Sequence, residues 1–172
     1  FGTLTMSSAE SSDFLPVDGL TANSNGTDAD RITYTLPSMA PGLTLVVQTQ
    51  DGTSIANATR GETVNVFAAN YTTGPMSFDL VRAEFSTASI NSRTGIKAAY
   101  DFGVAKVTYG QMKHDVVAAS SDVTETGLTV STTVANTALS VSRATSKTGT
   151  AAKRTGNAFG ASYALSKRTS IA

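Results

Sequence analysis

The sequence predicts an all-β protein whose strands follow one another as an antiparallel, up-and-down sheet. Short runs rich in β-branched and aromatic residues alternate apolar with polar positions, and clusters of Gly, Asn, Ser and Asp separate these runs. The connections between the runs alternate between short and long. Charged residues make up only 15% of the chain, against ~25% in soluble domains. Together these features favour a transmembrane β-barrel, because each strand of such a barrel is apolar on one side only.

The first half of the chain contains strand signals in several short runs. They cover residues 1–7, 31–36, 43–50, 62–71 and 76–85. In the second run Ile32 and Tyr34 share one face, and Arg31 lies on the other. The last run changes the parity of its apolar residues part way along, and a β-bulge near Leu80 would bring them all to one face.

The second half continues the pattern, for a total of about eleven strands. These runs cover residues 95–101, 104–111, 127–134, 137–143 and 157–165, with a last piece that ends at 172. The hairpin from 95 to 111 has the clearest alternation. Ile96 and Tyr100 lie on its apolar face, and Lys97 and Lys106 lie on the opposite one.

The lengths of the connections indicate how the strands are ordered. Short ones lie near 37–42, 72–75, 101–103, 135–136 and 166–168, and longer polar ones lie near 51–61, 86–93, 114–126 and 144–156. Tight turns therefore lie at one end of the strands and long loops at the other, as in an up-and-down membrane barrel. Tyr71, Tyr100 and Tyr163 fall beside tight turns, where an aromatic girdle would place its rings towards lipid and its hydroxyls in water.

Composition excludes several classes of protein. Lys and Arg number 13, as do Asp and Glu, so no basic surplus indicates a nucleic-acid partner. Cys is absent and His114 is the single histidine, so we predict neither a metal site nor a cofactor. No apolar run approaches the ~20 residues of a membrane-spanning helix. No motif supports a hydrolase built on His114, so we predict no catalytic residue and no enzymatic activity.

Two stretches resemble a known family. Residues 100–106 read Tyr-Asp-Phe-Gly-Val-Ala-Lys and are similar to a hairpin of the general porins of Gram-negative β-proteobacteria. Residues 160–170 are similar to a late hairpin of the same proteins, and residues 1–5 and 31–37 are weaker matches in the right order. The resemblance implies a sixteen-stranded trimeric barrel. Residues 1–172 would then be part of a single transmembrane domain, from its fifth strand through most of its fifteenth, within a longer protein.

The resemblance also implies a passive outer-membrane channel for ions and small hydrophilic solutes, surrounded by lipid and lipopolysaccharide and assembled as a homotrimer. Residues 8–30 would form a constriction loop, since a polar stretch of more than ~12–15 residues is usually functional or disordered. Its carboxylates Glu10, Asp13 and Asp18 would face wall cations across the pore. The predicted wall cations are Arg31, Lys97, Lys106 and, if the bulge near Leu80 exists, Arg82. The alternative is a secreted or surface β-sandwich, an adhesin-like structural module.

Overall fold

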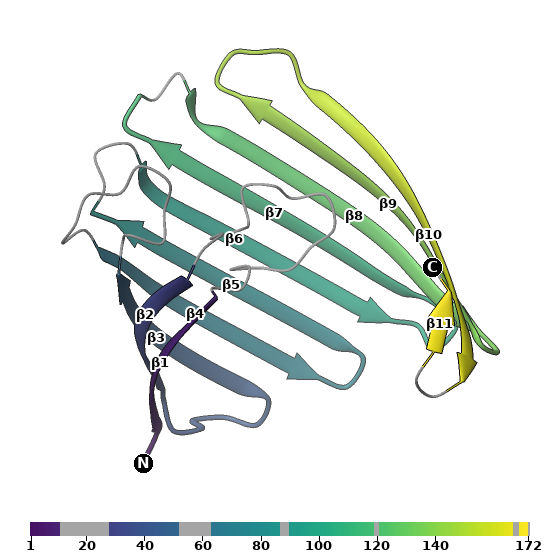
Figure 1. Ribbon diagram of the computed structural model, residues 1–172, viewed down its shortest axis with the longest axis horizontal. Coiled ribbons are helices and arrows are strands. Elements are labelled where there is room, and N and C mark those ends of the chain that lie inside the picture. Colours follow the sequence, from purple (N-terminus) through teal and green to yellow (C-terminus); the bar gives the residue numbers. More distant parts are fainter. Residues whose placement is uncertain (11–27, 52–62, 87–89, 119–120, 167–168, 172) are drawn as a thin grey trace.

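The computed structural model describes residues 1–10, 28–51, 63–86, 90–118, 121–166 and 169–171. Within these residues eleven strands form one antiparallel sheet, and their order in the sheet is their order in the sequence. Figure 1 shows a single, strongly curved layer that runs from β1 at one edge to β11 at the other. The predicted all-β, up-and-down arrangement is therefore confirmed. The β-sandwich alternative is not, because it requires two facing sheets.

Strands β4 to β10 are longer than β1 to β3 and β11. Their bounds are Thr3–Glu10 (β1), Asp28–Thr35 (β2), Leu43–Asp51 (β3), Thr63–Thr73 (β4), Met76–Phe85 (β5), Ile90–Asp101 (β6), Lys106–Val116 (β7), Val123–Val134 (β8), Thr137–Thr148 (β9), Arg154–Ser166 (β10) and Thr169–Ile171 (β11). Strands β4 to β10 hold 10 to 13 residues, enough to cross a bilayer, for which a tilted strand needs ~9–11. No helix in the described part of the chain is long and apolar enough to cross a membrane.

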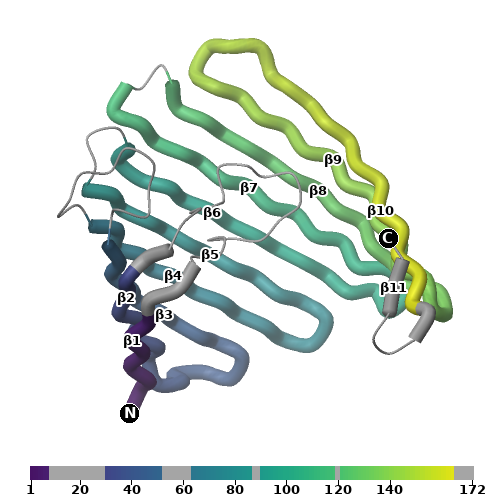
Figure 2. Tube along the Cα trace, viewed as in Figure 1, coloured from purple at the N-terminus to yellow at the C-terminus, as the bar shows by residue number. Residues whose placement is uncertain are grey.

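Successive connections alternate between the two ends of the sheet, and the two-residue turns lie at one end. Tight turns join β4 to β5, β6 to β7 and β8 to β9. Figure 2 shows these turns at one end of the strands, opposite the end where residues 149–153 connect β9 to β10. Gly74, Gly103 and Ala135 have positive φ angles of 52°, 83° and 53° in these turns. The loops predicted at 86–93, 114–126 and 144–156 were too long, because strands β6 to β10 extend into them.

The two faces of the sheet differ in burial and in chemistry. On the outer face large apolar side chains are exposed, for example Tyr34, Val47 and Phe67, which lie opposite one another on β2, β3 and β4. On the inner face Gln50, Thr129 and other polar side chains are buried. Burial identifies the faces because side chains converge on the concave side of a curved sheet and spread apart on its convex side.

The inner face also carries apolar side chains towards the ends of β4 and β5 that lead into the longer connections. This inner apolar patch consists of Val64, Val66, Val81, Ala83, Phe85 and Met112. Val64 and Met112 are completely buried. These residues explain the change of parity along β5, because the strand is apolar on its outer face near one end and on its inner face near the other.

The bulge predicted near Leu80 is not formed. Strand β5 pairs in continuous register with β4 from Met76 to Phe85 and with β6 from Met76 to Glu84. Arg82 therefore lies opposite Phe67, on the outer face, and the prediction that it lines the pore wall is wrong.

Candidate functional site: the inner wall of the sheet

Polar side chains of neighbouring strands join along the inner face. The Thr33 hydroxyl donates to Gln48 Oε1 at 3.0 Å, and Gln48 Nε2 donates to Gln50 Oε1 at 2.7 Å. Across β8 and β9 the hydroxyl oxygens of Thr129 and Ser142 are 3.0 Å apart. Such side chains hydrogen-bond to one another and to water, so this surface can line an aqueous passage.

Three polar residues meet across β4, β5 and β6 on this inner wall. Asn70 lies opposite Asp79, and Asp79 lies opposite Lys97. Lys97 Nζ is 3.0 Å from Asp79 Oδ2, and each side chain is 19% exposed. The Asn70 amide donates to the other carboxylate oxygen, Asp79 Oδ1. The charge of Lys97 is thus balanced by a carboxylate that is itself held in place by a hydrogen bond.

Lys97 was predicted from the sequence, whereas Asp79 was not. Asp79 has the parity opposite to that of Phe78 and Leu80, so the alternation at the start of β5 already places it on the inner face. Because a bulge was assumed near Leu80, the parity of Asp79 was not used to place it on the inner face.

Lys106 and Arg31 also lie on the inner face, but neither is adjacent to Lys97. Lys106 begins β7 at the tight-turn end, opposite Asp101, and is exposed. Arg31 lies on β2, where its Nε donates to Ser7 Oγ at 3.1 Å. The structure therefore spreads these three cations over the wall.

The predicted acidic partners lie at or beyond the end of β1. Glu10 is its last residue, opposite Asp28 in register. Asp13 and Asp18 lie outside the described residues, as does most of the segment 8–30.

A further inner-wall cation is Arg93, which lies within the predicted loop 86–93 but in fact belongs to strand β6. It lies opposite His114 in the β6–β7 register, and its Nε donates to His114 Nε2 at 3.4 Å. Its guanidinium carbon is 5.2 Å from the centroid of the Phe85 ring, at the edge of the inner apolar patch. Among the described residues no three His, Cys, Asp or Glu side chains are grouped so that they could hold a metal ion.

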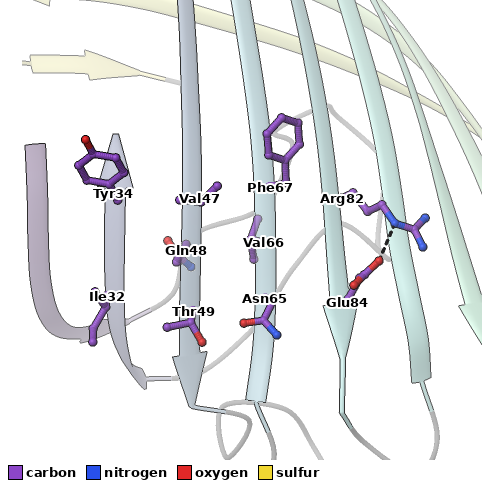
Figure 3. A pocket seen from close by; sticks show the side chains of 10 residues that line it. All are labelled: Ile32, Tyr34, Val47, Gln48, Thr49, Asn65, Val66, Phe67, Arg82 and Glu84. Carbon is purple, nitrogen blue, oxygen red and sulfur yellow. Dashed lines mark hydrogen bonds and ion pairs between the residues drawn. The ribbon is translucent and has the colours of Figure 1, made fainter. Parts of the chain in front are cut away.

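Arg82 points away from this wall. Its Nε is 3.1 Å from Glu84 Oε1, and the two side chains are 49% and 63% exposed. Figure 3 shows this pair beside Asn65 and Phe67 on the outer side of neighbouring strands. Its Nη1 also donates to Thr94 Oγ1 on β6 at 3.0 Å.

Three tyrosines lie on the outer face near the tight turns. Tyr71, Tyr100 and Tyr163 are 42%, 40% and 48% exposed. The Tyr100 ring contacts Phe102 with centroids 4.5 Å apart, and both line a shallow apolar groove with Tyr71 and Tyr109.

An up-and-down sheet with a polar inner face and an apolar outer face is the wall of a transmembrane β-barrel channel. Residues 2–172 match the protein family described as Gram-negative porin. A solved structure described as a porin refined at 1.8 Å resolution superposes with a TM-score of 0.72 and 20% sequence identity, covering 99% of this chain and 70% of that one. Comparison with curated proteins gave no match. The chain belongs to the Gram-negative porin family: it is an outer-membrane diffusion channel without enzymatic activity.

Proposed function

We propose that this chain is a general porin of the β-proteobacterial type, whose homotrimer passes ions and small hydrophilic solutes. In this proposal the segment 8–30 enters the barrel and narrows it, and charged side chains of the inner wall set a weak ion selectivity. The main observation in support is the inner apolar patch, because its side chains need a segment inside the barrel to cover them.

Apolar side chains are not expected on the wall of a water-filled pore. Val64, Val81 and Met112 are nonetheless only 0–3% exposed on the inner face, and the described strands form a single layer. Exposing such side chains to water costs about 25 cal/mol for each Å² of apolar surface, so a covering segment is needed. The segment 8–30 is suited to this role, because Phe14-Leu15-Pro16-Val17 and Leu20 supply apolar surface within an otherwise polar stretch.

Covering the patch in this way would leave the carboxylates of the segment free to line the passage. Asp13 and Asp18 flank the apolar residues in the sequence, and Glu10 precedes them. Facing them, Lys106 is the exposed wall cation that we expect to contribute most to the positive field, and Arg31 and Lys97 lie on the same wall. Asp79 offsets the charge of Lys97. Opposed charges of this kind order water and ions in a pore and bias which ions pass.

We further propose that Tyr71, Tyr100 and Tyr163 form part of the aromatic girdle at the tight-turn boundary of the membrane. Their exposed rings beside the tight turns support this role, since tyrosine places an apolar ring and a polar hydroxyl at such boundaries. The apolar outer face above them would contact lipid, with lipopolysaccharide in the outer leaflet.

Cysteine cross-linking in the full-length protein tests the position of the segment. The chain has no native cysteine, so Leu15→Cys combined with Ala83→Cys supplies the only thiol pair in this region. We expect a short bismaleimide to join the two residues and to reduce single-channel conductance. The matched control is Leu15→Cys with Ala69→Cys, since Ala69 lies on the outer face of β4. Cross-linking to Ala69→Cys alone, or to neither, would contradict the proposal.

A further inference from the structure

A hollow lies in the inner wall where β8, β9 and β10 run side by side. Its volume is about 500 Å³, and its inner-facing lining includes Glu125, Ser142, Ala144, Ser146, Arg154 and Gly156. We refer to the space above these six residues as the wall hollow. None of the six belongs to the predicted wall cations or to the segment 8–30.

Small residues form the floor of the wall hollow. Gly127 on β8 is opposite Ala144 on β9, and Ala144 is opposite Gly156 on β10. A β-carbon built on Gly156 would meet no atom within 4 Å apart from those of its chain neighbours. The wall is therefore open above this row, and a solute can approach the backbone of the strands closely.

Two opposite charges border this floor on the side of the longer connections. Glu125 and Arg154 are both opposite Ser146, so the three residues form one row across β8, β9 and β10. Arg154 is the first residue of β10, next to the connection 149–153. The backbones of strands two apart are separated by about 9.5 Å. Side chains as long as those of Glu and Arg can both reach a small molecule that lies above the serine between them.

The two charges differ in their surroundings. Arg154 is exposed. Glu125 is only 3% exposed, and its charge interacts with that of Arg93 on β6. This cation offsets the cost of burying the carboxylate. Since water screens a buried charge less than an exposed one, Glu125 supplies a fixed negative charge at one end of the row and Arg154 a solvated positive charge at the other.

We propose that the wall hollow binds small zwitterionic solutes, of the α-amino acid class, as they enter the pore. The guanidinium of Arg154 binds the carboxylate of the solute as a planar fork, the carboxylate of Glu125 faces its ammonium group, and the hydroxyl of Ser146 lies between them. The rest of the solute lies over the floor of small residues. The proposal rests on the proposed function, because it needs the inner wall to line a passage for solutes.

The arrangement of charges favours a zwitterion over a simple ion. A simple anion bound to Arg154 would also meet the buried carboxylate of Glu125, and a simple cation near Glu125 would meet the guanidinium. Like charges placed together disfavour the wrong partner, so a solute that carries both charges matches the row best.

Block of the ion current through the full-length protein in a planar bilayer tests the proposal. The probe is L-glutamine. N-acetyl-L-glutamine lacks its ammonium charge, and L-glutaminamide lacks its carboxylate charge. We expect glutamine to reach half of its maximal block at a concentration at least fivefold lower than either derivative.

Two variants locate the block in the wall hollow. Arg154→Gln should raise the half-blocking concentration of glutamine at least fivefold, and its matched control is Lys153→Gln, which removes the neighbouring cation from the connection between β9 and β10. Gly156→Leu fills the hollow and should weaken the block to a similar extent. Its matched control is Ala161→Leu, which adds bulk to the outer face of the same strand. Both controls should block as the wild type does.

Equal block of the wild type by glutamine and by either derivative would overturn the proposal, as would unchanged block of Arg154→Gln. If Gly156→Leu does not fold, Gly156→Ala is measured instead, and a rise of at least twofold in the half-blocking concentration is expected. Conductance in KCl without solute separates this result from the proposed function. Normal conductance without block by glutamine contradicts the wall hollow alone, whereas a wild type that does not conduct contradicts the proposed function as well.

Discussion

The ion pair between Asp79 and Lys97 makes the sharpest prediction about selectivity. Asp79→Asn keeps the shape of the side chain but removes the negative charge that lies 3.0 Å from Lys97 Nζ. The inner wall then gains one net positive charge at this position. We expect the permeability of anions relative to cations to rise, because the uncompensated ammonium attracts anions and repels cations.

Coulomb's law gives the size of the effect. An ion passing about 6 Å from the ammonium in water feels roughly 0.7 kcal/mol. With a Debye length of about 10 Å at 0.1 M salt, screening reduces this to roughly 0.4 kcal/mol. That energy raises the local concentration of anions about twofold and lowers that of cations about twofold, so the ratio of anion to cation permeability should rise roughly fourfold. Removing a hydrogen-bonded, partly buried partner should also cost about 1–3 kcal/mol of stability.

Reversal potentials across a planar bilayer with a KCl gradient measure the permeability ratio directly. Glu84→Gln is the matched control, because it frees a cation from a carboxylate in the same strand but on the outer face. A second control, Asp79→Asn combined with Lys97→Gln, restores the balance of charge and should return the ratio to the wild-type value. An unchanged ratio in Asp79→Asn, or an equal shift in Glu84→Gln, would refute the reasoning.

Three further predictions follow from the inner wall and the turns. Lys106→Glu should shift the reversal potential towards cation selectivity, because the side chain is exposed on the inner wall; no shift would place it outside the field of the pore. Asp13→Asn combined with Asp18→Asn should shift the reversal potential towards anion selectivity if the segment 8–30 lines the passage, and no shift would argue against that role. Gly74→Ala should destabilise the β4–β5 turn by about 1–2 kcal/mol, because its φ is 52°; thermal unfolding followed by circular dichroism measures the loss, with exposed Ala151→Gly as a control expected to change little.

Local alternation predicted the faces of the hairpin from 95 to 111 correctly. Ile96 and Tyr100 lie on the outer face, whereas Lys97 and Lys106 lie on the inner one. This succeeded because the period of a strand is fixed by its backbone and needs no knowledge of its neighbours. The same rule misled us on β5, where an apolar inner residue such as Val81 looked like an outer one. A single sequence cannot show that part of an inner wall is apolar because another segment is needed to cover it.

Side-chain contacts between neighbouring strands could not be predicted from the sequence, for a different reason. The contact of Asp79 with Lys97 depends on the β5–β6 register, and register follows from turn geometry and from the packing of the whole sheet. Strand ends were missed as well. Polar residues such as Lys113 and Lys147 extend the strand pairing beyond the apolar part of each strand. From the sequence alone, such polar residues cannot be assigned to a paired strand rather than to a loop.

The depth at which the wall cations lie decides how they act together. In the β6–β7 register Lys97 is opposite Gly110, which is four residues along the strand from Lys106. At about 3.3 Å per residue the two lysines are about 13 Å apart along the strand, more than the Debye length of about 10 Å at 0.1 M salt. A permeating ion therefore meets them one after the other, and substitutions at the two positions should have additive effects on selectivity at that salt concentration. At 0.01 M salt the Debye length grows to about 30 Å, so the effects of the two substitutions on selectivity should no longer be additive. This change with salt concentration would show that the two lysines act at different depths of the pore rather than in one ring of charge.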